Sequence, residues 1–281
     1  MAKNTSTSDY VMADVKTQNQ LWYLSLKGNL HKTVLPGDQK DIQILDVGTG
    51  TGVWAVAMAK KWPDAKVVAT DLTLPPQTDD APPNLSFIRH NANDPEWPFE
   101  KFHFIHGRML DAGIRDWPAF RATCFRHLLP GGHLELAHVT HPMHSELPEF
   151  DSPGASPFLR LMHQVTLASK KGGIDYDVSS KHLRGLADVG FEDIEETAIV
   201  WPIGTWPQQE NEREIGMLGL KNTLGIVDLA AKSILTHQNF MGKEEADDLV
   251  QAGRDDLLQT DKKHFYLTMK LFTAKKPCTP A

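Results

Sequence analysis

The sequence lacks several features that define whole classes of proteins. It has only two cysteines, Cys124 and Cys278, in 281 residues, which excludes a disulfide framework and favours a reducing, cytoplasmic compartment. Its longest apolar stretch, residues 53–59, is far shorter than the roughly 20 residues that cross a bilayer. The amino terminus is polar and has no apolar core of a secretory signal. We therefore expect no membrane association.

An excess of positive charge is also missing. With 29 basic and 36 acidic side chains the net charge is −7, so the chain has no general attraction to nucleic acid or to an anionic membrane. The fractions of hydrophobic residues (41%) and charged residues (23%) are those of an ordinary soluble protein. The partner that we expect is a small molecule, and the oligomeric state stays open.

Strands and helices alternate in the first half of the chain. Expected strands cover residues 42–47, 66–70, 85–89, 102–106 and 133–139, with helices at 17–30, 53–61 and 117–129. This alternation predicts right-handed crossovers and a parallel sheet. The second half predicts longer helices and two further strands: helices at 157–169, 180–189, 212–237 and 243–259, and strands at 191–200 and 264–274.

The most informative motif is the glycine loop Gly48-Thr49-Gly50-Thr51-Gly52, directly after the first strand. Glycines there let the backbone turn tightly and approach a ligand, and the next helix presents free N–H groups. Asp71 ends the following strand about 20 residues later, where a carboxylate can bind ribose hydroxyls. The alternative is a glycine-rich turn whose carboxylates only cap a helix.

Two residues around the loop indicate which cofactor it binds. Val53 stands where a dinucleotide-binding loop needs Gly or Ala, which disfavours a nicotinamide oxidoreductase. Asp46, before the loop, would repel a pyrophosphate but suits a cofactor with an ammonium group. S-adenosylmethionine has that ammonium group, a sulfonium and a ribose.

The loop with Asp46 and Asp71 resembles motif I and its acidic partner in class I S-adenosylmethionine methyltransferases. The resemblance extends to the fungal LaeA-like and UMTA-like methyltransferases of secondary metabolism, and it rests on these further segments: Trp97-Pro-Phe99, Phe104-Ile-His106-Gly-Arg108, Pro130-Gly-Gly-His-Leu-Glu135 and Trp201-Pro-Ile-Gly-Thr-Trp206-Pro. The chain departs from that group at Gln20-Leu21, His103 and His138. These departures concern the acceptor more than the fold.

The resemblance implies an α/β fold: a Rossmann-like sheet of seven strands, the last one antiparallel, with helical cap segments. It divides the chain into an amino-terminal helical cap at 1–40, a methyltransferase domain at 41–277 with a helical insertion at about 207–260, and a tail at 278–281. The cofactor residues that it implies are Asp46, Gly48, Thr49, Gly50, Gly52, Asp71, Leu72, Asn91, Asn93 and His106. Of the two asparagines, Asn93 is preferred for the adenine amino group.

Acceptor chemistry is indicated less directly. His138, His141 and His144 recur every third residue, which allows a metal site, an acid–base role or ordinary loop histidines. We expect no metal, with His138 and His141 as catalytic residues. Trp22, Arg108 and Trp206 are expected to line the acceptor pocket, although aromatic residues in cap segments equally serve as core.

The predicted function is therefore methyl transfer from S-adenosylmethionine to a small secondary metabolite. The nucleic-acid alternative is disfavoured because residues 107–110 lack the Asn/Asp-Pro-Pro-aromatic loop of amino-methylating enzymes. S-methylation of a gliotoxin-type dithiol is the leading hypothesis, because a thiol is partly ionised and strongly nucleophilic. O- or N-methylation of another metabolite and a LaeA-like regulatory role are the alternatives.

Overall fold

The computed structural model describes residues 15–35, 41–75, 81–174 and 176–278. The chain divides into two compact units. A sheet unit comprises Leu26–His138, Asp177–Ala198 and Lys270–Ala281, and a helical unit comprises Met1–Ser25, Val139–Tyr176 and Ile199–Met269. The predicted insertion at 207–260 falls entirely within the helical unit, whereas the predicted domain boundaries themselves stay predictions.

The sheet has the predicted Rossmann-like order. Its parallel strands run in the order β3-β2-β1-β4-β5, and their bounds are β1 (Gln43–Val47), β2 (Lys66–Asp71), β3 (Leu85–Arg89), β4 (Phe102–Arg108) and β5 (Leu128–Val139). The last strand, β8 (Phe265–Lys275), lies antiparallel beside β5, and β7 (Glu192–Pro202) pairs with β8. The predicted fold class is thus confirmed.

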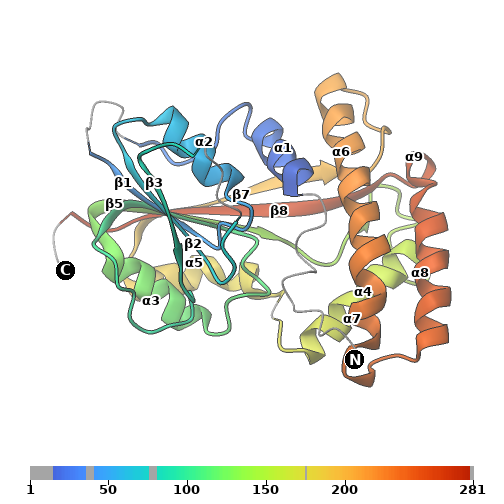
Figure 1. Cartoon of the computed structure of the whole chain (residues 1–281). Helices are drawn as coiled ribbons and strands as arrows, with labels where there is room; N and C mark the ends of the chain where they lie inside the picture. The colour runs from blue at the N-terminus through green and yellow to red at the C-terminus, as the bar shows by residue number, and fades with distance from the viewer. Residues whose placement is uncertain (1–14, 36–40, 76–80, 175, 279–281) are drawn as a thin grey trace. The chain divides into compact units, whose positions relative to one another are not determined.

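Helices cover both faces of the sheet in the sheet unit (Figure 1): α2 (Val53–Lys61) on one face, and α3 (Trp117–His127) with α5 (Val178–Val189) on the other. The α2 side has its own apolar core, which includes Ile44, Met58 and Phe104. The core on the opposite side includes Leu45, Phe120 and Leu186. Alternate residues of each strand therefore face different helices.

The end of α3 differs from the prediction. A helix to residue 129 was predicted, but the helix ends at His127. Pro130, Gly131 and Gly132, residues typical of a turn, already belong to β5. The Gly131 N–H donates to the Lys276 carbonyl at 2.9 Å, so the segment pairs with β8. A Cβ at Gly132 would lie 2.9 to 3.2 Å from the backbone oxygens of Leu129, Phe102 and His103, so glycine suits this close approach to β4.

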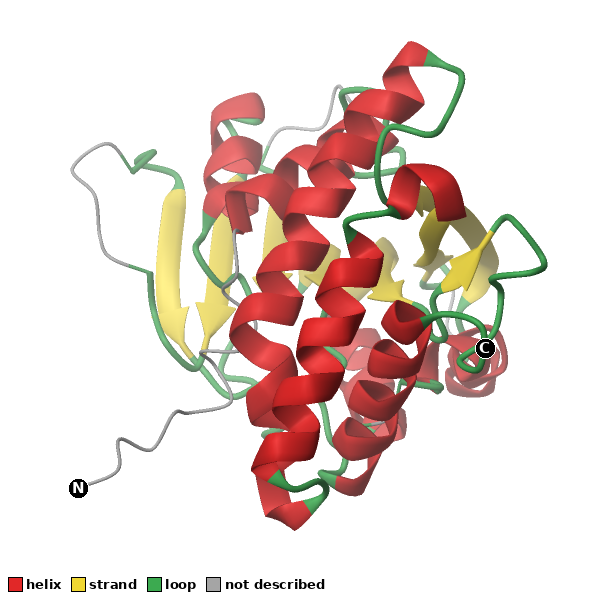
Figure 2. Cartoon of the chain, turned by 90° about the vertical axis from the view of Figure 1, so that its right-hand side faces the viewer, coloured by secondary structure: helices red, strands yellow, loops and turns green. Residues whose placement is uncertain are grey.

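The helical unit contains the longer helices, α4 (Pro157–Lys171), α6 (Glu210–Ile226) and α8 (Lys243–Leu257), and Figure 2 draws all helices in red. Its other elements are α1 (Val15–Ser25), β6 (His144–Ser145), α7 (Lys232–Thr236) and α9 (Thr260–Lys263). Helix α4 packs against α7 and α8, and α1 packs against α6. No helix in the described ranges is both long enough and apolar enough to cross a membrane.

Two helices of the helical unit are much shorter than predicted. The helix expected at 212–237 is interrupted by a π-helical turn, Val227–Ala231, and a 3₁₀ turn, His237–Asn239, follows α7. Helix α1 ends at Ser25 instead of residue 30, because Lys27 and Gly28 adopt positive φ angles of 53° and 82°. Left-handed residues of this kind end helices.

Candidate active site

The glycine loop turns directly from β1 into α2. Gly48, Gly50 and Gly52 have φ angles of 67°, 57° and 75°, which residues with a Cβ rarely adopt. A Cβ at Gly50 would meet no atom within 4 Å, so this side of the loop is open. The hydroxyl oxygens of Thr49 and Thr51 are buried without a partner among the described residues. The loop thus offers an open face and unsatisfied polar atoms to a ligand.

Asp46 lies just before the loop, on the α2 face of the sheet. Parallel pairing sets it opposite His106 of β4, and its Oδ1 lies 2.8 Å from Nδ1 of His106. The His106 ring stacks on the Trp54 indole, with ring centres 3.7 Å apart. The second carboxylate oxygen of Asp46 is buried and has no partner among the described residues. Such an oxygen is costly to bury alone, and a cationic group would satisfy it.

Asp71 holds the loop from the end of β2. Its Oδ2 accepts a hydrogen bond from the Gly50 N–H at 2.9 Å, and its Oδ1 accepts one from the Thr73 N–H at 3.1 Å. A carboxylate offers about four acceptor sites, so both oxygens keep capacity for hydroxyl donors. The next residue, Leu72, is 56% exposed, which is unusual for a leucine beside a buried strand.

The two asparagines after β3 differ in the capacity of their amide oxygens. The Asn91 oxygen already accepts from both the backbone N–H and the side-chain amide of Asn93, at 3.1 Å each. The Asn93 oxygen accepts from the Arg115 N–H at 2.9 Å. Because an amide oxygen has two lone pairs, the Asn93 oxygen retains one for a ligand amino group. This geometry favours the predicted choice of Asn93.

Arg108 extends the polar row on the α2 face. Burial lowers the pKa of its guanidinium to about 10, while the carboxylates of Asp46 and Glu135 oppose that shift. Sequence reasoning did not assign Glu135 a role. Its Oε2 accepts hydrogen bonds from the N–H groups of Lys32 and Thr33, at 3.0 and 2.8 Å, and from the Thr33 hydroxyl at 2.7 Å. Glu135, on β5, therefore holds Lys32 and Thr33, which precede β1, by hydrogen bonds.

His138 and His106 lie on opposite faces of the sheet. His138 follows Leu134 and Leu136 at alternate positions of β5, and both leucines belong to the core beside α3 and α5. Its Nδ1 lies 2.9 Å from Oδ1 of Asp111, and its ring stacks on His182 with centres 4.5 Å apart. The structure does not bring His138 to the polar row of Asp46 and His106.

Asp111 and His182 were not predicted as site residues. His182 sits between Val178 and Leu186 on the buried stripe of α5, and this helical spacing was available in the sequence. Asp111 comes shortly after β4 and has no comparable pattern. Its pairing with His138 spans 27 residues of sequence and depends on the fold.

The remaining predicted residues lie in the helical unit. His141 Nδ1 is 3.2 Å from the Thr166 hydroxyl, and its ring centre lies 4.3 Å from that of Tyr176. Trp22 is buried and packs edge-on against Trp201, with ring centres 5.1 Å apart. These contacts are compatible with core packing, and an acceptor role for Trp22 stays a prediction.

Trp206 and His144 also have partners within this unit. Trp206 stacks on His264 at 4.7 Å and donates to the Phe265 carbonyl at 3.1 Å. His144 lies 3.1 Å from Asp151. Among the described residues no three or more His, Cys, Asp or Glu side chains are grouped so that they could hold a metal ion.

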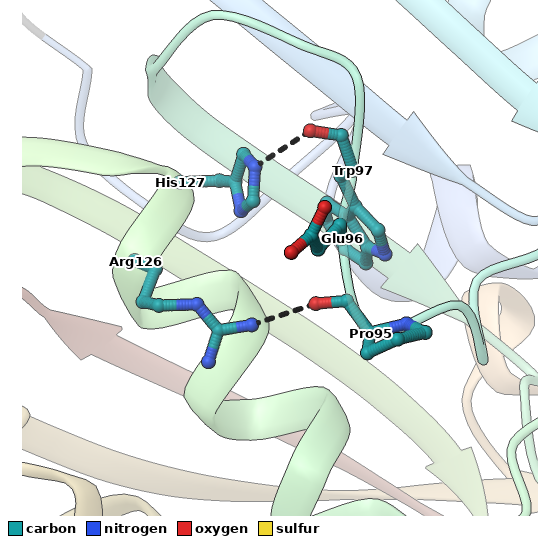
Figure 3. Close-up of a pocket in the computed structure, with 5 residues that line it drawn as sticks. All are labelled: Pro95, Glu96, Trp97, Arg126 and His127. Atoms are coloured by element: carbon teal, nitrogen blue, oxygen red, sulfur yellow. Dashed lines mark hydrogen bonds between the residues drawn. The ribbon is translucent and has the colours of Figure 1, made fainter.

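A surface pocket of about 430 Å³ lies elsewhere, between the loop after β3 and the end of α3 (Figure 3). It is lined by Pro95, Glu96, Trp97, Arg126 and His127, none of which is a predicted site residue. Arg126 and His127 donate to the carbonyls of Pro95 and Trp97, at 2.9 and 3.1 Å (Figure 3). These contacts hold the loop in place and make the pocket a poor candidate for the active site.

Comparison with known proteins identifies the family. The model of a methyltransferase domain matches residues 23–196. The chain belongs to this methyltransferase family. It is 30% identical to "Methyltransferase pytC" of Aspergillus terreus over 86% of this chain and 74% of the relative. It is 29% identical to "Secondary metabolism regulator LAE1" of Cochliobolus heterostrophus, over 92% of this chain and 85% of the relative.

Solved structures give the same fold. A phosphoethanolamine N-methyltransferase 2 of Haemonchus contortus, crystallised with S-adenosylhomocysteine, aligns with a TM-score of 0.55 at 17% identity. The alignment covers 98% of this methyltransferase but only 59% of the worm enzyme. The [4+2]-cyclase SpnF aligns with a TM-score of 0.51 at 16% identity, over 93% of this chain and 81% of that one.

Methyltransferases of this family take their methyl group from S-adenosylmethionine. The sheet unit fits that cofactor on three observations. The buried oxygen of Asp46 without a partner matches an ammonium group. The space beside Gly50, next to Asp71, accommodates a ligand close to the backbone. The exposed side chain of Leu72 offers an apolar surface where an adenine would stack.

Proposed function

We propose that this methyltransferase transfers the methyl group of S-adenosylmethionine to a small-molecule secondary metabolite. The observation that carries the proposal is the buried, unpartnered Oδ2 of Asp46 beside the open glycine loop. The names of the relatives support the metabolic setting, since pytC is named a methyltransferase and LAE1 a regulator of secondary metabolism.

Six of the predicted residues have a role in holding the cofactor. Asp46 accepts a hydrogen bond from the ammonium group, and the backbone at Gly48 and Gly50 surrounds the amino-acid end. Asp71 accepts hydrogen bonds from the ribose hydroxyls, and Leu72 packs on the adenine. Asn93 accepts from the adenine amino group with its remaining lone pair. The cofactor, when bound, supplies a methyl group on a positively charged sulfur.

For the acceptor we propose a thiol of a small dithiol of the gliotoxin type. Methyl transfer is an in-line displacement, so the protein must align the nucleophile and take up its proton. A thiol has a pKa of about 8.5 and is a strong nucleophile, so one histidine suffices as base. His138, oriented by the Asp111 carboxylate at 2.9 Å, and His141 are the candidates.

Calorimetric titration with S-adenosylhomocysteine tests the cofactor site. We expect Asp71→Ala to weaken binding at least tenfold, because the ribose loses its acceptor and the loop loses the bond to Gly50. Asp64→Ala is the matched control, since Asp64 lies exposed near the amino ends of the strands. Wild-type protein that binds no cofactor, or unchanged binding by Asp71→Ala, would refute the proposal.

Incubation with methyl-labelled cofactor tests the acceptor. A reduced dithiol should be labelled faster than its matched alcohol and amine at every pH. Label on the alcohol or amine alone would establish O- or N-methylation instead. Label that enters only protein would favour a role like that named for the LAE1 relative.

A further inference from the structure

Four polar side chains contact one another in a buried row on the α3 and α5 side of the sheet unit. Asp111 pairs with His138 at 2.9 Å, and His138 stacks on His182 at 4.5 Å. Nδ1 of His182 lies 3.4 Å from a guanidinium nitrogen of Arg121. All four residues are at most 5% exposed. Trp117 closes the cluster, with its ring 5.1 Å from each imidazole.

The partners at the two ends fix the proton positions on both imidazoles. A guanidinium only donates, so Nδ1 of His182 accepts and its proton is on Nε2. A carboxylate only accepts, so Nδ1 of His138 carries the proton that faces Asp111. In the neutral ring, Nε2 of His138 therefore has a free lone pair. The two stacked rings are opposite tautomers.

The groups that surround the two histidines also differ. Burial, together with the nearby His138 and Arg121, lowers the pKa of His182 to about 2, so His182 stays neutral. The groups that face His138 are Asp111 from the loop after β4, Trp117 from α3, His182 from α5 and Phe272 from β8. Asp111 is the only one of these that carries a charge.

The free polar atoms of the cluster match an ordered water. Five buried atoms have no partner among the described residues: Oδ2 of Asp111, Nε2 of His138, Nε2 of His182, Nε1 of Trp117 and Nε of Arg121. Buried polar groups are almost always satisfied by protein or by water. Two of these atoms are acceptors and three are donors, and one water molecule can donate to both acceptors and accept from two of the donors.

Helix α5 has a glycine where it contacts this row of side chains. Gly185 lies inside the helix, where glycine is unfavourable, and a Cβ there would lie 2.5 Å from the Arg121 guanidinium. An alanine at this position would displace Arg121 from His182. Gly185 thus lowers the stability of the helix but leaves room for the Arg121 guanidinium.

We propose that Asp111 and His182 are positioning residues that keep Nε2 of His138 unprotonated. Nε2 then accepts the acceptor's proton through a water molecule bound in the same cluster. This rests on the proposed function. As the acceptor S–H bond breaks, the proton moves to the water, and a proton of that water moves to Nε2. An electron pair of the acceptor sulfur would form the bond to the methyl carbon. The bond between that carbon and the cofactor's sulfur would break, and its electron pair would stay on the cofactor's sulfur. The imidazolium later releases its proton to solvent.

Rates of dithiol methylation across pH test the proposal, with Asp111→Asn compared with wild type. At neutral pH we expect kcat to fall about 100-fold with little change in KM, because His138 loses its orientation. The deficit should shrink as pH rises past about 8.5, where the thiol ionises without a base. His127→Gln is the control, since the two ring nitrogens of His127 lie against the backbone carbonyls of Thr123 and Trp97, and it should leave the profile unchanged.

Nitrogen NMR of histidine-labelled full-length protein gives a readout independent of activity. We expect His138 protonated on Nδ1 and His182 on Nε2, with no titration of His182 between about pH 5 and 9. The reverse tautomer at His138, or a kcat deficit that is constant across pH, would overturn the inference while thiol methylation itself stands. If the wild type binds cofactor but methylates no thiol, the proposed acceptor is wrong and this inference fails with it.

Discussion

Replacing Asp46 by asparagine should separate cofactor affinity from stability. The variant keeps an oxygen to accept from His106 but removes the charge at the buried, unpartnered Oδ2. A charge-assisted hydrogen bond contributes about 1.5–3 kcal/mol, and each 1.4 kcal/mol is tenfold, so affinity for S-adenosylhomocysteine should fall about 10- to 150-fold. The unliganded protein should lose no stability, because a neutral amide is less costly to bury than a carboxylate whose Oδ2 has no donor.

The assay is a double-mutant cycle by calorimetry, with thermal unfolding measured in parallel. Wild type and Asp46→Asn are each titrated with S-adenosylhomocysteine and with an analogue that lacks its amino group. The analogue should bind both proteins equally, so the coupling energy reports the ammonium contact alone. An equal loss of affinity for both ligands would mean that Asp46 acts only through the loop. A lower unfolding temperature of the unliganded variant would show that Oδ2 already has a partner.

Two further substitutions test how the segment before β1 and the loop are held. Glu135→Ala should cost about 3–5 kcal/mol of unfolding free energy in denaturant titrations, because three donors, two of them buried, lose their acceptor. Glu195→Ala removes only the exposed salt bridge to Lys32 and should cost ~0–1 kcal/mol, so equal losses would contradict this account. Gly50→Ala should weaken cofactor binding, whereas Gly173→Ala, at a φ of 91° with equally open surroundings, should be strained but bind normally.

The local order of the cofactor site could be predicted from the sequence. The bounds of α2 and β3 match the predicted 53–61 and 85–89, because a buried apolar run followed by glycines and a helical period is a short-range pattern. The position of Asp71 at the end of β2 follows from the same alternation. The helix end at His127 was missed, since Pro130-Gly131-Gly132 is a turn signal that pairing with β8 overrides.

The chemistry of the buried polar groups was decided only by tertiary structure. The three donors on Glu135 come from about 100 residues earlier in the chain, with a separation of 102 for the Thr33 N–H. Whether a histidine lies on the α2 face, like His106, or on the α3 and α5 face, like His138, depends on strand register. A shift of one residue exchanges the two faces, and no local pattern fixes that register. Residue types and their order determined the family and the cofactor loop, whereas long-range pairing determined which acids orient which bases.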